Sequence, residues 1–220
     1  MRDRRLTIVL FLGIACALSF AGLPFVDVFA SAQTGTQTRG PAKAPASKPA
    51  QDTQVYRNAT FGFRYQIRYG WVDRTKEIRD QAAAETADSP QGNVLLAAFE
   101  RPPNASGDTV NSAVVIASEN ASVYPKLKKA EDYIEPLTEL ATAKGFKADG
   151  DPSVAEIDGR HLVRADFIEP LTDKLTMHQS TLILLAKGRI VSFTFVAGSE
   201  DEIDDLIDGL HFEAAKSSAH

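Results

Sequence analysis

Cysteine is almost absent from this chain, since Cys16 is the only one among 220 residues. Cys16 lies inside an apolar N-terminal run, so the chain beyond that run holds no thiol. This excludes a disulfide framework, a thiol nucleophile and a thiolate metal ligand there. The fold must therefore be stabilised by an ordinary hydrophobic core, and the chain from residue 55 onward is long enough to bury one.

Motifs for catalysis or metal binding are also lacking. His178 and Ser180 are two residues apart and would share one face of a strand, with Asp173 nearby, which is the one arrangement that suggests a base and a nucleophile. No Gly-x-Ser-x-Gly turn accompanies them, and the acidic stretch 200–208 lacks the central glycine of a calcium loop. We therefore expect no catalytic residue, no metal ligand and no cofactor. Two alternatives to a non-enzymatic role stay open. They are an envelope hydrolase using His178 and Ser180, and a carrier of a small ligand or metal ion.

Basic residues are in the minority, because 24 Lys and Arg face 29 Asp and Glu, for a net charge of −5. Six of the basic residues but only three of the acidic ones precede Val55, so the rest of the chain is more acidic still. This balance excludes nucleic acid as the main ligand. A local exception is the stretch that holds Arg64, Arg68 and Arg74, which we take as a candidate surface for an envelope protein or another anionic surface.

The N-terminus has the features of an export signal. An arginine-rich start is followed by an apolar run over Leu6–Leu23, and Ala30 and Ala32 supply a small-x-small site for signal peptidase. Residues 1–32 are therefore expected to be a signal peptide that is cleaved. The protein would then act outside the cytoplasm, in the periplasm or as a secreted protein.

Two other interpretations of this segment stay open. The apolar stretch 6–26 is close to the ~20 residues that cross a bilayer, so an uncleaved N-terminal anchor would also suit it and would be the only membrane attachment. The residues before Cys16 also faintly resemble a lipoprotein box.

Residues 33–54 have the composition of a flexible linker. They contain no aromatic and no branched aliphatic residue, and they repeat proline at Pro41, Pro45 and Pro49. Such a segment cannot bury enough apolar surface to offset its ordering entropy, and proline makes it a partly extended spacer. We expect a single domain over residues 55–214, followed by a disordered tail over 215–220.

Within the domain, the hydrophobic pattern predicts several strands. Apolar residues at 61, 63, 65 and 67 alternate with polar or small ones, which is typical of a strand with one buried face. The runs 94–99 and 113–117 are nearly all apolar, as in strands covered on both sides. Asp158-Gly159 and Lys187-Gly188 each separate two such runs and predict type I′ hairpins.

Helical patterns fall between and after these strands. Apolar residues recur at helical spacing over 130–141, with Gly145 as the C′ glycine and Pro136 either in the first turn or at a kink. Ser199 and Glu202 have the spacing of a capping box ahead of an apolar stripe at 203, 206, 207 and 210. A third, short helix is expected over Thr75–Glu85.

Several of these residues together resemble a known superfamily. They are Phe61-Gly62-Phe63-x-Tyr65 leading to Gly70-Trp71, the Lys-Gly hairpin into Val191, Phe193 and Phe195, the capped acidic helix, and the closing Leu210-x-Phe212. In this combination the chain resembles the PsbP-like superfamily, which includes extrinsic photosystem proteins, a Ran-binding nuclear protein and DcrB-like envelope proteins. Arg68 stands where the family pattern has proline.

The resemblance implies a fold and a class of function. The fold would be α+β, an antiparallel sheet of about six to seven strands flanked by helices on both faces. The function would be non-enzymatic binding or assembly. With the export signal, this makes the chain an exported binding or assembly module of the cell envelope.

Overall fold

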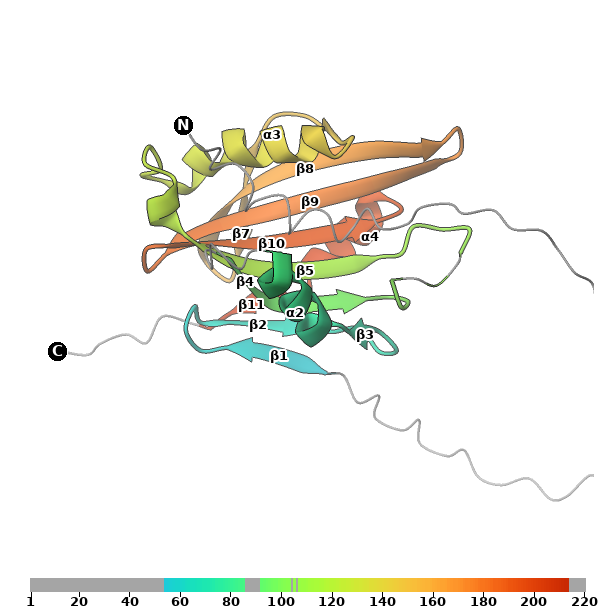
Figure 1. Ribbon diagram of the computed structural model, residues 1–220, viewed down its shortest axis with the longest axis horizontal. Coiled ribbons are helices and arrows are strands. Elements are labelled where there is room, and N and C mark those ends of the chain that lie inside the picture. The colour runs from blue at the N-terminus through green and yellow to red at the C-terminus, as the bar shows by residue number, and fades with distance from the viewer. Residues whose placement is uncertain (1–53, 86–91, 104, 106, 214–220) are drawn as a thin grey trace, which may run out of the picture.

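The computed structural model describes residues 54–85, 92–103, 105 and 107–213 (Figure 1). The expected signal peptide, nearly all of the expected linker, and the expected tail lie outside these residues. Within the described ranges, no helix combines the length and the apolar character needed to cross a membrane.

A large antiparallel sheet forms the centre of the molecule (Figure 1). Its strands follow the order β3-β4-β5-β10-β9-β8-β6, and β7 also pairs with β8. Their bounds are β3 Val72–Asp73, β4 Gly92–Phe99, β5 Ala113–Asn120, β6 Lys147–Ala148, β7 Ser153–Ile157, β8 Arg160–Thr172, β9 Leu175–Ala186 and β10 Arg189–Ala197. The expected α+β fold class is confirmed, and the two-residue strands β3 and β6 extend the sheet beyond the six to seven strands expected.

Two tight turns set the register of four strands in this sheet. Asp158 and Gly159 join β7 to β8 with φ angles of 48° and 74°, and Lys187 and Gly188 join β9 to β10 with 51° and 70°. Positive φ at both central residues is the signature of the type I′ turn. Both predicted hairpins are therefore confirmed.

The strand predicted around Phe63 lies in a second, smaller sheet. This sheet has the order β1-β2-β11, with β1 over Val55–Asn58, β2 over Phe63–Gln66 and β11 over Leu210–Phe212. The sequence did not predict this second sheet. The physical reason is one-sided burial, because Phe63 and Tyr65 pack down onto the main sheet while Arg64 and Gln66 face solvent.

Helices cover both faces of the main sheet, as expected. Helices α2 (Thr75–Glu85) and α3 (Ile134–Ala143) lie on one face, and the short turns η1 (Ala121–Val123) and η2 (Ala130–Tyr133) lead into α3. Helix α4 (Glu200–Ile207) shares the other face with the small sheet. Pro136 falls in the first turn of α3, where a missing N–H does no harm.

Each face has its own hydrophobic core. On the α3 side, Tyr133, Leu137 and Phe146 pack against Phe167 and Ile183 of the sheet. On the α4 side, aromatic rings of the small sheet meet those of β10, with the centroids of Phe63 and Phe193 only 5.0 Å apart. Most strands of the main sheet are thus buried on both faces, which explains their almost continuous apolar sequence.

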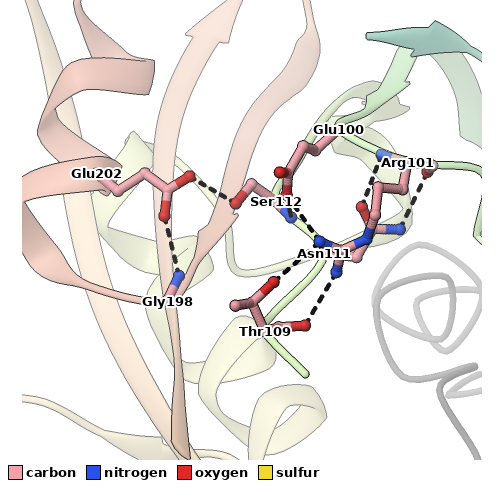
Figure 2. A network of polar contacts seen from close by, with 7 residues as sticks. All are labelled: Glu100, Arg101, Thr109, Asn111, Ser112, Gly198 and Glu202. Carbon is pink, nitrogen blue, oxygen red and sulfur yellow. Dashed lines mark hydrogen bonds and ion pairs between the residues drawn. The ribbon is translucent and has the colours of Figure 1, made fainter. Parts of the chain in front are cut away.

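Polar contacts hold the start of α4 against the main sheet (Figure 2). The Ser199 hydroxyl accepts a hydrogen bond from the Glu202 N–H at 3.3 Å, which is one half of the predicted capping box. The Glu202 carboxylate does not return to Ser199. It accepts from the Ser112 hydroxyl at 2.7 Å and from the Gly198 N–H at 3.3 Å instead. The carboxylate therefore ties α4 to the strand that follows Ser112.

The loop before that strand is held by the same network (Figure 2). The Arg101 N–H donates to Asn111 Oδ1 at 2.9 Å, and the Asn111 amide donates back to the Arg101 carbonyl at 3.1 Å. The Arg101 guanidinium donates to both the hydroxyl and the carbonyl of Thr109, each at 2.9 Å. These bonds fix the start of β5, and through Ser112 they fix the first turn of α4.

A buried carboxylate lies on the opposite face, at the end of β5. Glu119 is 3% exposed and accepts hydrogen bonds from the hydroxyls of Tyr124 and Tyr133, each at 2.8 Å. Burial raises the pKa of Glu119 above its ordinary value of 4.5, although the two tyrosine hydroxyls and Arg189 oppose that shift. The folded protein therefore holds a proton at Glu119 more strongly than the unfolded chain does.

This raised pKa predicts a pH dependence of stability. Glu119 contributes its full stability below the unfolded pKa, and that contribution is lost as the pH rises through the higher folded value. The free energy of unfolding of the wild type, minus that of Glu119→Gln, should therefore fall as the pH is raised from below 4.5, the ordinary carboxyl pKa, through neutrality. Urea unfolding of both proteins across this range measures the difference, because titrations that they share cancel. A difference that is flat or rises with pH would contradict this prediction.

Candidate functional site

A cavity of about 290 Å³ lies where the first turn of α4 meets β8, β9 and the segment after β6. Six of the residues that line it are ionisable: Asp149, Arg164, Asp166, His178, Glu200 and Asp204. Alternation along β8 and β9 places the side chains of Arg164, Asp166 and His178 on the α4 face. The Asp149 N–H donates to the Asp166 carbonyl at 2.8 Å, which holds Asp149 beside β8.

Arg164 joins the sheet to α4 across this cavity. Its Nε lies 2.9 and 3.0 Å from the two carboxylate oxygens of Asp166, and its Nη1 donates to Asp204 Oδ1 at 2.9 Å. Burial disfavours the charge on Arg164, but the hydrogen bonds and charges of the two carboxylates outweigh it and raise the pKa of the guanidinium. Arg164 is thus a permanent cation whose charge is already matched by two anions.

A second set of side chains in the cavity is not paired in this way. Ligand atoms of Asp149, His178 and Glu200 all lie within 4.8 Å of one another. None of these three side chains has a hydrogen bond or ion pair to another residue in the described part of the chain. An imidazole and two carboxylates form a donor set that can bind a divalent transition metal.

The predicted base and nucleophile do not form a catalytic pair in this geometry. His178 and Ser180 share a face of β9, but no hydrogen bond joins them among the described residues. The Ser180 hydroxyl is fully buried and has no partner there, and Asp173 is exposed in the turn between β8 and β9. Nucleophilic catalysis needs a base in contact with an accessible hydroxyl.

The candidate partner surface divides into paired and unpaired arginines. Arg68 lies 3.6 Å from Asp205 of α4, and Arg74 lies 3.0 Å from Glu77 in the first turn of α2. Arg64 is exposed on the outer face of the small sheet, and its guanidinium has no hydrogen bond or ion pair with any residue that the structure describes. Of the three, Arg64 is therefore the one whose charge no carboxylate of the described chain already pairs.

A cross-strand row extends the surface around Arg64. Arg57 of β1 and His211 of β11 are its direct neighbours on either side. The Arg57 guanidinium is also exposed and without a partner in the described ranges, and His211 Nδ1 lies 3.4 Å from Asp158 Oδ2. We call Arg57, Arg64 and His211 the basic row.

Sequence reasoning missed the cluster of Asp149, His178 and Glu200. Asp149 comes from a loop, His178 from a strand and Glu200 from a helix, so no motif spacing connects them. The one signal available was the position of Glu200 beside a helix cap, which has an ordinary explanation in the helix dipole.

Comparisons with known proteins bear on the fold. No family model and no curated protein matches this sequence. The structure is similar to cyanobacterial PsbP from Synechocystis, at 14% identity and a TM-score of 0.47, over 79% of this chain and 100% of that one. It is also similar to the Ran-binding protein Mog1p of Saccharomyces cerevisiae, at 8% identity and a TM-score of 0.41, over 74% and 96% of the two chains.

A third similar structure is a protein of unknown function from Pseudomonas aeruginosa, at 15% identity and a TM-score of 0.36, over 71% of this chain and 89% of that one. The similar structures include a PsbP protein, and the likeness is one of fold alone.

Proposed function

We propose that this protein is an exported, non-enzymatic binding or assembly module of the cell envelope, which contacts an acidic surface of a partner protein through the basic row. The observation that carries the proposal is the placement of Arg57 and Arg64 side by side on a solvent-facing sheet, with no anion of the described chain near enough to pair with either. Like charges directly opposite each other destabilise a sheet slightly. A bound anion would relieve that repulsion.

The small sheet presents these arginines on a rigid support. Phe63 and Tyr65, on the opposite side of β2, are almost completely buried at 0% and 1% exposure. Strands held in this way lose little backbone freedom when a partner binds, which lowers the entropic cost of association. The basic row is therefore preorganised for contact.

Exposed apolar groups in the small sheet and just after its strand β2 favour a protein as the partner. Val55 lies in the same sheet and is 40% exposed, and Tyr69 follows β2 and is 70% exposed. Tyrosine and arginine are enriched among the residues that dominate protein interfaces.

The charge of the whole chain disfavours a lipid surface. The chain is acidic overall, at −5, so an anionic bilayer would repel most of it. Each basic residue contributes only about 1 kcal/mol of attraction to such a bilayer, which is little for two arginines. An acidic patch on a protein can match the basic row without facing the rest of the molecule.

The envelope location rests on the N-terminal features, the apolar run and the Ala30 and Ala32 site. The linker predicted over residues 33–54 leads directly into β1, which carries Arg57. Any attachment through the linker would therefore begin at the sheet that holds the basic row.

Charge reversal of the basic row tests the proposal. A photo-crosslinking amino acid at Gln66, which faces solvent on the same sheet, should capture a specific partner in the native host. Arg57→Glu/Arg64→Glu should reduce that crosslink by about tenfold or more, and added salt should reduce it in the wild type, because solvated charges are screened beyond about 10 Å at 0.1 M.

The matched control is Lys126→Glu/Lys174→Glu, which makes the same change in net charge at exposed positions elsewhere. This control should keep the crosslink. Stability should change little in Arg57→Glu/Arg64→Glu, since two like charges still face each other and surface changes are usually within about 0.5 kcal/mol. Equal crosslinking by both variants would refute the contact, whereas partners recovered only from the cytoplasm would refute the envelope role.

A further inference from the structure

The cluster of Asp149, His178 and Glu200 is distinct from the basic row and holds three potential ligands, one imidazole and two carboxylates, that converge from a loop, a strand and a helix. Asp149 follows β6, His178 lies in β9, and Glu200 is the first residue of α4. Their ligand atoms lie within 4.8 Å of one another, and all three residues line the cavity of about 290 Å³. The arrangement has room for a small ligand at its centre.

The charge of the cavity favours a cation. Among the described residues that line it, Arg164 is the one arginine or lysine, and it donates hydrogen bonds to Asp166 and Asp204. The carboxylates of Asp149 and Glu200 are left without a counter-charge in the described part of the chain. The positive end of the α4 dipole opposes a cation here, but three acidic residues in the first turn of α4 offset it.

We infer that Asp149, His178 and Glu200 bind one divalent transition-metal ion of the Zn²⁺ class. An imidazole nitrogen with two carboxylate oxygens suits Zn²⁺, whereas Ca²⁺ and Mg²⁺ prefer oxygen ligands alone. Three protein ligands leave a fourth tetrahedral position for water or for a group from another molecule. The site is therefore open on one side.

The scaffold holds these ligands close to the geometry that a metal needs. Metal–ligand distances of about 2.0–2.2 Å place neighbouring ligand atoms roughly 3.3 Å apart in a tetrahedron. Asp149 and Glu200 are exposed side chains and can close by about an ångström through rotation. Their backbones are held in place. The Asp149 N–H donates a hydrogen bond to the Asp166 carbonyl, and the Glu202 carboxylate ties the first turn of α4 to the Ser112 hydroxyl (Figure 2).

Calorimetric titration of the untagged full chain with Zn²⁺ tests the site. We expect one Zn²⁺ per chain and no competition from a large excess of Ca²⁺. His178→Gln and Glu200→Gln should each weaken binding by more than about tenfold, since even outer partners of a metal ligand contribute about 10–100-fold. Circular dichroism checks that both variants fold, and Glu200 is exposed on a helix, so its variant is the safer of the two.

The matched control is His161→Gln. His161 is exposed, and its Nε2 lies 3.4 Å from Glu156 Oε2, so it offers a histidine–carboxylate pair outside the cavity. This variant should bind Zn²⁺ as the wild type does. Co²⁺ should give the absorption bands of a tetrahedral site in the wild type and the control, and not in His178→Gln.

Three results would overturn the inference. They are unchanged Zn²⁺ affinity in His178→Gln and Glu200→Gln, loss of binding in His161→Gln, or displacement of Zn²⁺ by Ca²⁺. None of them bears on the crosslink at Gln66, so this inference and the proposed function fail separately.

Discussion

Replacing Phe63 with alanine is expected to lower the free energy of unfolding by about 3–5 kcal/mol. The Phe63 side chain is completely buried between the two sheets. Its ring packs edge-on against Phe193 at 5.0 Å between centroids and against Phe212 at 6.3 Å. The substitution therefore removes apolar contacts and leaves a cavity between elements that are held apart by their own hydrogen bonds.

Urea unfolding of the two proteins measures this loss. Arg64→Ala is the control, because Arg64 is the next residue of the same strand but points to solvent, and its replacement should change stability by less than about 0.5 kcal/mol. Phe63→Leu should recover part of the loss by filling some of the cavity. A loss below about 1 kcal/mol in Phe63→Ala would mean that the small sheet does not pack on the main sheet through this face.

The second large effect is expected at Glu119. Glu119→Ala should cost about 2–4 kcal/mol, because it creates a cavity and leaves a tyrosine hydroxyl buried without a partner. Tyr133 is 2% exposed, and its hydroxyl donates to Glu119 Oε1 at 2.8 Å. Tyr124 donates to the other carboxylate oxygen at the same distance but is only half-buried, so water can replace that bond more easily.

A double-mutant cycle separates the hydrogen bond from the cavity. Tyr133→Phe removes the hydroxyl and keeps the ring, so Glu119→Ala/Tyr133→Phe should lose less stability than the sum of the two single variants. The coupling energy should be about 1–2 kcal/mol, within the range of residues in direct contact. Additive losses would mean that the bond between Tyr133 and Glu119 contributes nothing to stability.

Local patterns were sufficient for most strands of the main sheet and for the helices that cover it. Asp158-Gly159 and Lys187-Gly188 predicted two hairpins because positive φ at consecutive residues has few other sequence solutions. The apolar run in β5 predicted burial on both faces, and of the two placements left open for Pro136 the first turn of α3 is the one found. Each of these signals lies within a few residues of the structure that it determines.

Sequence patterns predicted less of the structure where a residue's partner lies far along the chain. The alternation at Phe63 predicted a one-faced strand, but its pairing with β1 and β11 in a separate sheet depends on which apolar surface it covers. The Glu202 carboxylate was expected at its own helix cap, but it accepts hydrogen bonds from the Ser112 hydroxyl, just before β5, and from the Gly198 N–H instead. A donor from far along the chain can replace a local one, and no local pattern reveals it.

In the candidate sites, too, local spacing predicts some contacts and tertiary structure sets the others. The pairing of Arg74 with Glu77 follows from helical spacing and could be predicted, whereas the pairing of Arg68 with Asp205 could not. That Arg64 is without a partner in the described chain, and lies between Arg57 and His211, follows from the register of three strands.

By itself, the sequence determined the lack of thiol chemistry, the acidic balance, the N-terminal features typical of export, and the type of most helices and strands, because composition and short-range periodicity are properties of neighbouring residues. The tertiary structure alone decided that Asp149, His178 and Glu200 share a cavity, and that the Ser180 hydroxyl is buried with no hydrogen-bond partner among the described residues. Side chains from a loop, a strand and a helix meet only after the two cores have packed, since the free energy that brings them together comes from apolar burial elsewhere in the chain.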